Sequence, residues 1–288
     1  MKGTGRVKKK ISRLLGNNQK KKFEKFIYSN TAPGYFEQRG ADKAVNIELV
    51  SFVNAASFPD LALSMLSFLN AAGRPKKWTL YVDDEFSQYQ KNIISKLSFA
   101  ELRKWDETLN EADKRRFSKR WQLRKFAAYA GHRLNGTTIF LDSDVLFYPL
   151  FSNYLDSFES GNWYLPEPPE ANNIDDDLIK HFDFKRQMYI VNAGFFIFNT
   201  TPDWHRGFEY LDFCSQTEKE HYFLDQSALN IMYHHDLNAR ILDPRVFHAT
   251  ADDHFMLRAL NTSGFAIRHY VGLIRHKMWQ LGWKGLFK

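Results

Sequence analysis

The sequence of 288 residues is poor in cysteine and has no long apolar run. Its one cysteine, Cys214, excludes an internal disulfide framework and is typical of a protein from a reducing compartment. No apolar stretch approaches the roughly 20 residues that a membrane-spanning helix needs. The basic N-terminus also lacks the apolar core of a secretory signal. The sequence therefore predicts a cytoplasmic protein.

Positive charge is scarce in the middle of the chain, although the formal net charge is +7. Residues 1–28 hold ten Lys and Arg against one acid, and residues 268–288 hold five against none. Residues 29–267 consequently carry 25 basic and 32 acidic side chains. A nucleic-acid-binding fold would carry a basic stripe across its body, so we predict no nucleic-acid partner.

Both basic ends also carry apolar residues. Ile11, Leu14 and Leu15 recur at helical spacing among lysines, and residues 277–287 interleave Trp, Leu and Phe with Lys. Aromatic and basic residues together suit a lipid headgroup interface, where each Lys or Arg adds about 1 kcal/mol near an anionic surface. The pattern fits peripheral binding at the inner face of a membrane. It also fits a solvated arm and a tail that packs on its own domain.

Strand and helix patterns alternate along the body of the chain. Strands are predicted over 46–54, 77–84 and 138–144, and helices over 59–72, 86–97 and 122–134. This alternation predicts an α/β fold with a mixed, mostly parallel sheet and helices on both faces. In open sheets of this kind, ligands bind off the carboxyl ends of the strands.

Two carboxylates, Asp142 and Asp144, follow the apolar strand pattern that starts at Thr138. In an extended chain they share one face of the strand and leave Ser143 on the opposite face. Two hard oxygen donors at this spacing suit Mn²⁺ or Mg²⁺, with phosphate oxygens in the open positions. The alternative is a turn after the strand, in which each Asp binds local backbone amides.

Three later stretches add polar residues in apolar surroundings. "MYIVNAGFFIFN" (188–199) is a strand pattern whose glycine indicates that something approaches the backbone closely. "FLDQSALN" (223–230) starts a helix, where Asp225 would serve either a site or an N-cap. "IRHYVGLIRHKMW" (267–279) offers His269 as a nitrogen ligand.

Taken in order, "LDSDVL", "NAGFFIFN", "DQSALN" and "HYVGLIRHKMW" resemble the motifs of the family 8 glycosyltransferases. This retaining group includes glycogenin and bacterial lipopolysaccharide galactosyl- and glucosyltransferases. The resemblance covers roughly residues 45 to 280 and implies a GT-A-type (Rossmann-like) domain over 41–267. A basic amphipathic arm (1–40) would precede it, and a basic, aromatic tail (268–288) would close the site.

The resemblance implies a hexosyltransferase that uses a UDP-sugar, glucose or galactose, and retains the anomeric configuration. The acceptor would be a glycan, a glycolipid such as lipopolysaccharide, or a protein. Asp142, Asp144 and His269 match the ligands of a Mn²⁺ (or Mg²⁺) ion that bridges the donor diphosphate, and Asp225 and Gln226 match a catalytic pair beside the reacting carbon. Donor contacts are implied for Asn54, Lys125, Asp142, Ser143, Asn192, Ala193, Gly194 and Gly272.

The family's Lys-Pro-Trp motif is missing from the C-terminal stretch. Arg275 holds the register of the lysine, whereas Lys277 and Trp279 come two residues late. Either cation would neutralise the leaving diphosphate, and the sequence leaves both open.

Two other functions compete with the glycosyltransferase. A sugar nucleotidyltransferase would want a glycine-rich phosphate loop after the first strand, but residues 53–60 contain no glycine. A non-catalytic nucleotide-sugar-binding protein would have lost polar site residues, but the motif carboxylates, Gln226 and His269 are all present. The sequence therefore favours the transferase.

Overall fold

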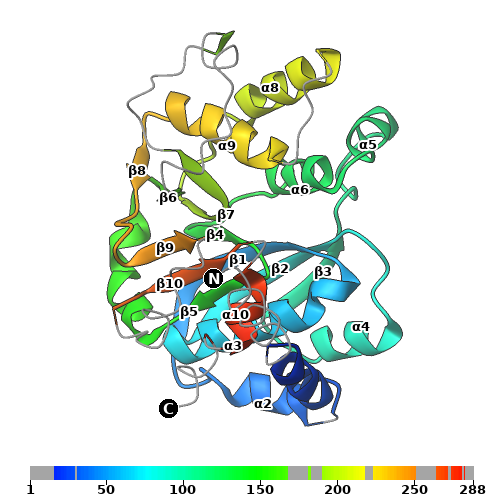
Figure 1. Cartoon of the computed structure of the whole chain (residues 1–288), viewed down its shortest axis with the longest axis vertical. Coiled ribbons are helices and arrows are strands. Elements are labelled where there is room, and N and C mark those ends of the chain that lie inside the picture. Colours follow the sequence, from blue (N-terminus) through cyan, green and yellow to red (C-terminus); the bar gives the residue numbers. More distant parts are fainter. Residues whose placement is uncertain are drawn as a thin grey trace, which may run out of the picture.

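The computed structural model describes residues 16–29, 31–167, 181–182, 190–217, 223–250, 264–271, 274–280 and 282. Its central element is a seven-stranded sheet (Figure 1). From edge to edge, the strands are β3 (Ala100–Lys104), β2 (Arg74–Val82), β1 (Ala44–Val53), β4 (Thr138–Leu141), β7 (Val191–Phe198), β6 (Asn162–Pro166) and β8 (Ala239–Ile241). A second sheet has three strands, in the order β5 (Val145–Phe147), β10 (Ile267–Tyr270) and β9 (Phe247–Thr250).

The large sheet is mixed and mostly parallel. β3, β2, β1 and β4 run parallel, as do β6 and β8, and β7 runs antiparallel to both of its neighbours, β4 and β6. The α/β architecture predicted from the sequence is confirmed.

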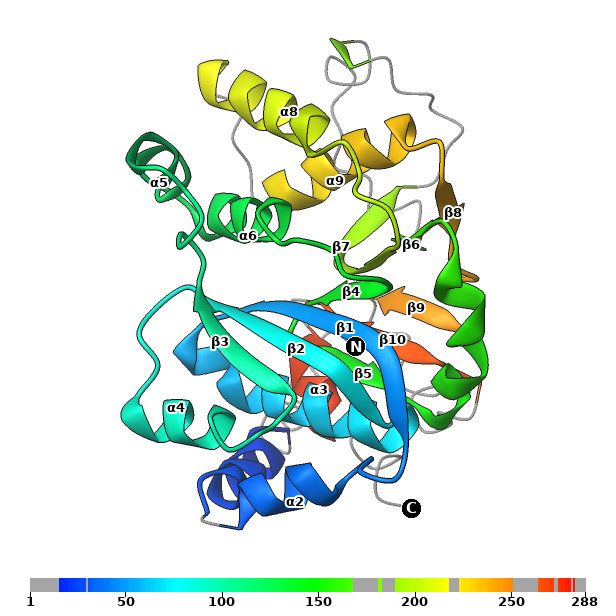
Figure 2. The ribbon, with the colours of Figure 1, turned by 180° about the vertical axis from the view of Figure 1, so that it is seen from behind.

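Helices cover both faces of this sheet, as Figures 1 and 2 show. The α-helices are α2 (Ala32–Gln38), α3 (Phe58–Ala71), α4 (Gln88–Ile94), α5 (Glu111–Phe117), α6 (Trp121–Ala130), α8 (Trp204–Gln216), α9 (Leu224–His235) and α10 (Arg275–Gln280), and residues 16–27 are also helical. Short 3₁₀ turns are η1 (Ala55–Ser57), η2 (Pro149–Tyr154) and η3 (Asp156–Glu159).

The apolar residues of the central strands alternate between two cores. On β1, Leu49 and Val53 join the core around α3, whereas Val50 and Phe52 join the core around α6, α8 and α9. Because successive side chains of a strand point to opposite faces, a strand buried on both faces reads as a continuous apolar run. This explains why Leu49, Val50, Phe52 and Val53 follow one another so closely on β1, with only Ser51 between them.

The predicted strand over 138–144 is too long at its carboxyl end. β4 ends at Leu141, and Asp142, Ser143 and Asp144 form a turn that leads into β5. The prediction of an extended backbone over Asp142, Ser143 and Asp144 is therefore wrong. The turn is held by long-range backbone bonds that the sequence pattern does not reveal: Asp142 N–H donates to Gly194 O at 2.9 Å, and Tyr270 N–H donates to Asp144 O at 3.0 Å.

The described parts of the predicted arm and tail contact each other. The ring of Phe23, in the helical residues 16–27, lies 5.3 Å from the ring of Trp279 in α10. Lys20 pairs with the buried Asp60 at 3.0 Å, and Trp279 Nε1 donates to the same carboxylate at 2.6 Å. Residues 1–15 and 283–288 lie outside the described chain. No described helix is long and apolar enough to cross a membrane.

Candidate active site

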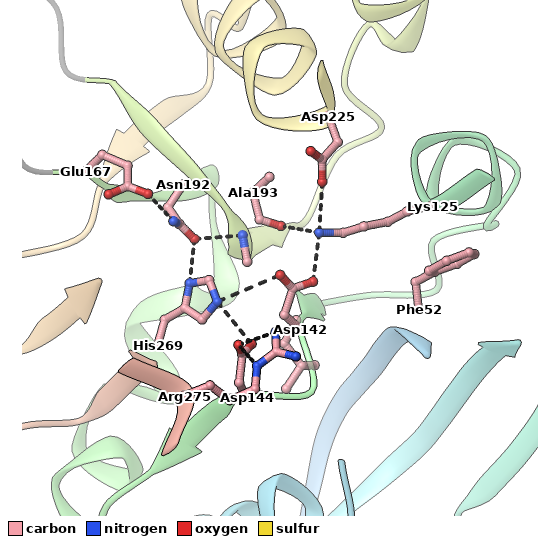
Figure 3. A network of polar contacts seen from close by, with 12 residues as sticks. Phe52, Lys125, Asp142, Asp144, Glu167, Asn192, Ala193, Asp225, His269 and Arg275 are labelled. Carbon is pink, nitrogen blue, oxygen red and sulfur yellow. Dashed lines mark hydrogen bonds and ion pairs between the residues drawn. The ribbon is translucent and has the colours of Figure 1, made fainter. Parts of the chain in front are cut away.

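The turn after β4 gathers polar side chains from distant parts of the chain (Figure 3). Lys125 comes from α6, His269 from β10 and Arg275 from α10. Since β10 pairs antiparallel with β5, with His269 opposite Val145, the imidazole is fixed next to the two carboxylates. The C-terminal ligand predicted from the sequence thus lies at the predicted carboxylates.

Each carboxylate gives one oxygen to a cation and turns the other toward His269. Asp142 Oδ1 lies 2.7 Å from Lys125 Nζ, and its Oδ2 lies 3.8 Å from His269 Nε2. Asp144 Oδ2 accepts a hydrogen bond from Nε of Arg275 at 2.7 Å and forms an ion pair with its Nη2, also at 2.7 Å. Oδ1 of Asp144 lies 3.2 Å from His269 Nε2. Among the described residues, the partners of these two side chains are Lys125, His269 and Arg275 and not local backbone amides, which was the alternative.

The electrostatics of Asp144 follow from this arrangement. Its side chain is 1% exposed. Burial alone would raise its pKa, but His269 and Arg275 outweigh burial and hold the pKa well below its ordinary value. The carboxylate is therefore ionised and available as a ligand at neutral pH.

Asp142, Asp144 and His269 fit a divalent metal ion. Each offers one ligand atom, and these atoms lie within 4.8 Å of one another. Neighbouring ligands around an ion at about 2.1 Å stand about 3 Å apart, close to the 3.2 and 3.8 Å found between Nε2 and the two oxygens. Two carboxylate oxygens and an imidazole nitrogen are donors that Mn²⁺ accepts. These three residues would hold the ion.

The ring of His269 occupies the space beside Gly194. A Cβ atom built at Gly194 would lie 1.9 Å from Cε1 of the ring and 2.4 Å from Nδ1. The sequence predicted a close approach at this glycine, and the group that approaches is the imidazole. Burial lowers the pKa of His269, but Asp144 and the other nearby carboxylates raise it more, so the net direction is upward.

Lys125 joins two carboxylates in the interior. Its ammonium lies 2.7 Å from Asp142, 3.1 Å from Asp225 Oδ2 and 3.1 Å from the carbonyl of Ala193, to which it donates. Burial lowers the pKa of Lys125, but the paired carboxylates have the larger effect, and the net pKa lies well above its ordinary value. Burial raises the pKa of Asp225, an effect that Lys125 opposes. The N-cap residue of α9 is Phe223, so Asp225 is not the cap.

The remaining predicted residues stand apart from this network. Asn54 caps η1, where its Oδ1 accepts from Ser57 N–H at 2.9 Å. Ser143 is buried in the turn, and Gln226 lies half-buried next to Asp225. Among the described residues it is Arg275, not Lys277, that pairs with Asp144. Gly272 lies outside the described chain.

The sequence did not predict one acid of the network. Glu167 follows directly after β6 and accepts a hydrogen bond from Nδ2 of Asn192. The available signal was a carboxylate at the end of an apolar strand, on the same sheet edge as the motifs. Burial raises its pKa, and Asn192 and His269 oppose this increase.

Comparison with known proteins finds similarity at the level of structure. No family model matches the sequence, and no curated protein sequence matches it. The solved galactosyltransferase LgtC, in complex with donor and acceptor sugar analogues, covers 83% of this chain over 100% of its own, with 13% identity and a TM-score of 0.54. The glycosyltransferase GlyE from Streptococcus pneumoniae TIGR4 gives 14% identity and a TM-score of 0.54.

The match to GlyE covers 85% of this chain but only 61% of that protein, which is less than two thirds of its length. A TM-score of 0.54 to LgtC and to GlyE indicates a shared overall fold. The GT-A-type fold predicted from the sequence is thereby confirmed: the chain has the fold of these glycosyltransferases.

Proposed function

We propose that the protein is a metal-dependent glycosyltransferase. It transfers a hexose, glucose or galactose, from a UDP-sugar to a glycan, a glycolipid or a protein. The observation that carries this proposal is the cluster of Asp142, Asp144 and His269 at the carboxyl end of β4, with a cation on the outer oxygen of each carboxylate. That edge of a parallel sheet is where open α/β folds bind ligands.

The charge balance of the site supports a diphosphate ligand. Four carboxylates (Asp142, Asp144, Asp225 and Glu167) lie in the network with two cations (Lys125 and Arg275), which leaves an excess of two negative charges with neutral imidazole. A divalent ion would cancel that excess. The loaded site would then no longer repel the anionic diphosphate of a nucleotide sugar, and the exposed Arg275 would attract it.

Breaking the bond between sugar and phosphate puts negative charge on the departing diphosphate. A bound Mn²⁺ or Mg²⁺ ion would supply Lewis-acid stabilisation of that charge. Arg275 donates to Asp144 yet keeps 45% of its side chain exposed, so a diphosphate bound at the site could reach its guanidinium. Lys277, by contrast, is buried, which supports Arg275 as the contact.

We propose that the reaction retains the anomeric configuration. A glutamine at position 226 is too poor a nucleophile for the carboxylate double displacement of retaining hydrolases. Asp225, whose Oδ2 is held by Lys125, would bind sugar hydroxyls. The acceptor would then attack from the side of the leaving group. An inverted product anomer in an NMR spectrum would contradict this part.

The proposed donor contacts of Asn54, Ser143, Ala193 and Gly272 rest on the motif resemblance. Family 8 membership and a lipopolysaccharide acceptor rest on the same ground. These assignments can be tested once the reaction has been established by the experiment below.

The decisive test is UDP release from a panel of UDP-sugars, with Mn²⁺ or with chelator. We expect metal-dependent turnover of one sugar, lost in Asp144→Asn and kept in Asp156→Asn, which removes the same charge from an exposed position in η3. Binding of UDP-sugar without turnover, with acceptors present, would favour the non-catalytic alternative. Pyrophosphate release from UTP and a sugar phosphate would favour the nucleotidyltransferase. Absence of both binding and turnover would refute the donor assignment.

We propose in addition that the surface around residues 16–27 binds an anionic membrane. Lys21, Lys22 and Lys25 are exposed on this helix. Beside it lies a largely apolar cavity of about 370 Å³, lined by Gln19, Lys22, Phe23, Phe26, Tyr35, Leu63 and Trp279. Co-sedimentation should occur with vesicles containing phosphatidylglycerol and not with phosphatidylcholine alone, and should be lost when the three lysines are changed to Glu. Equal sedimentation with both vesicle types would contradict it.

A further inference from the structure

A chain of polar contacts runs from Glu167 through Asn192 to His269 (Figure 3). Nδ2 of Asn192 donates to Glu167, and Oδ1 of Asn192 lies 2.8 Å from Nδ1 of His269. The same Oδ1 accepts from the backbone N–H of Gly194 at 2.7 Å. Asn192 is 2% exposed and His269 is 4% exposed, so these contacts form away from water.

The chain determines which nitrogen of His269 faces the carboxylates. An amide oxygen only accepts hydrogen bonds, so the proton of this contact must sit on Nδ1. Nε2 then points at Asp142 and Asp144, and once it has lost its proton its lone pair can bind a metal. The orientation of the Asn192 amide is itself set from both sides. Glu167 accepts from the NH₂ group of Asn192 on one side, and the N–H of Gly194 donates to the Asn192 oxygen on the other.

We infer that Asn192 is a positioning residue for His269 and that Glu167 positions Asn192. The inference rests on the metal site of the proposed function and gives Asn192 a role different from donor contact. Groups that hold the second nitrogen of a metal-binding imidazole fix its tautomer and orientation. They affect metal affinity without touching the ion.

A purely structural role for Asn192 would have a different signature. In that case the amide satisfies the backbone of Gly194, and its loss lowers stability but leaves metal affinity unchanged. Asn199, directly after the other end of β7, offers the matched comparison. Its side chain binds Thr137, Phe158 and Gly161, and none of these belongs to the metal cluster.

The test measures Mn²⁺ affinity of the full chain by calorimetry in the absence of nucleotide. Asn192→Leu keeps approximate shape but removes donor and acceptor. Its dissociation constant should rise by about 10- to 100-fold, the range for loss of such a partner. Asn199→Leu should lose stability in thermal unfolding and keep the wild-type affinity.

A double variant, Asn192→Asp with Glu167→Gln, provides the rescue. It exchanges the carboxylate and the amide between the two positions. The carboxylate at position 192 then accepts from Nδ1 of His269, and the NH₂ group at position 167 donates to that carboxylate. Affinity should return most of the way to wild type. In Zn²⁺-loaded protein with ¹⁵N-labelled histidine, NMR should show His269 protonated at Nδ1 and metal-bound at Nε2, and this signal should be absent in His269→Ala.

The possible outcomes distinguish a failure of the positioning role from a failure of the proposed metal site. Unchanged affinity in folded Asn192→Leu, or no recovery in the folded double variant, would overturn the positioning role while leaving the metal site in place. Ligation through Nδ1 would also overturn it. No Mn²⁺ binding by the wild-type protein would overturn the proposed metal site and the inference with it.

Discussion

Replacing Gly194 by alanine puts a methyl group where the imidazole of His269 now lies. The new Cβ would lie 1.9 Å from Cε1, 2.4 Å from Nδ1 and 2.6 Å from Nε2. Since carbon atoms pack at about 3.5 Å or more, the ring must move by roughly 1.6 Å. Catalytic and metal-binding groups tolerate displacements of only about 0.5 Å, so Nε2 leaves its position beside the carboxylates.

The expected result is a loss of Mn²⁺ affinity of about 100-fold, equivalent to about 2.7 kcal/mol. Overpacking should also lower the free energy of unfolding by about 1–3 kcal/mol. Calorimetry with Mn²⁺ and thermal unfolding measure the two effects separately. His269→Ala should show the same affinity loss, because both changes remove the same ligand.

Gly207→Ala is the matched control for the steric effect. A Cβ at Gly207 would lie 2.3 Å from Cζ of Phe126, a core residue that is not one of the three proposed ligands. This variant should lose stability and keep Mn²⁺ affinity. If folded Gly194→Ala binds Mn²⁺ as tightly as the wild type, His269 is not a ligand and the reasoning fails.

Three further perturbations follow from the described contacts. Lys125→Met should lower the free energy of unfolding by about 3–5 kcal/mol, because Asp142 and Asp225 lose their buried cation. Urea denaturation measures this loss, and adding Asp225→Asn to the same protein should restore part of the stability. Arg275→Gln should lower kcat by about 100-fold or more through loss of a donor to the leaving group, whereas the exposed Arg245→Gln should not. Burial raises the pKa of Asp60, so the folded protein binds its proton more tightly than the unfolded chain. Wild-type stability should therefore fall relative to Asp60→Asn as pH rises above about 3.8, and parallel pH profiles of unfolding would contradict the assignment.

The fold was predictable where burial on both faces imposes a continuous pattern. The strand predicted over 46–54 is β1 at 44–53, and the helix predicted over 59–72 is α3 at 58–71. Boundaries failed where long-range hydrogen bonds decide them. The end of β4 depends on Gly194 and Tyr270, which bind the turn backbone from other strands, and no local pattern at residues 138–144 contains that information.

The candidate site was predictable as a set of residue types and not as a geometry. Asp144 and His269 lie 125 positions apart, and only the motif resemblance brought them together before the structure did. Glu167 has no motif around it, so its role emerges only from contact with Asn192. That Arg275 pairs with Asp144 likewise could not be read from the sequence, because the two residues lie on different elements far apart in the chain.

The topology explains why a C-terminal histidine completes a site built on a central strand. The chain leaves the large sheet at Leu141, turns through Asp142–Asp144, and enters the small sheet at Val145. β10 pairs with β5 just beyond the turn, and Tyr270 N–H binds Asp144 O, so the carboxylates sit where the two sheets meet. Loosening β10 would remove the imidazole and the support of the turn together. Metal affinity should therefore report the docking of the C-terminal strand more sensitively than overall unfolding does, because the large sheet remains paired through β1, β4 and β7.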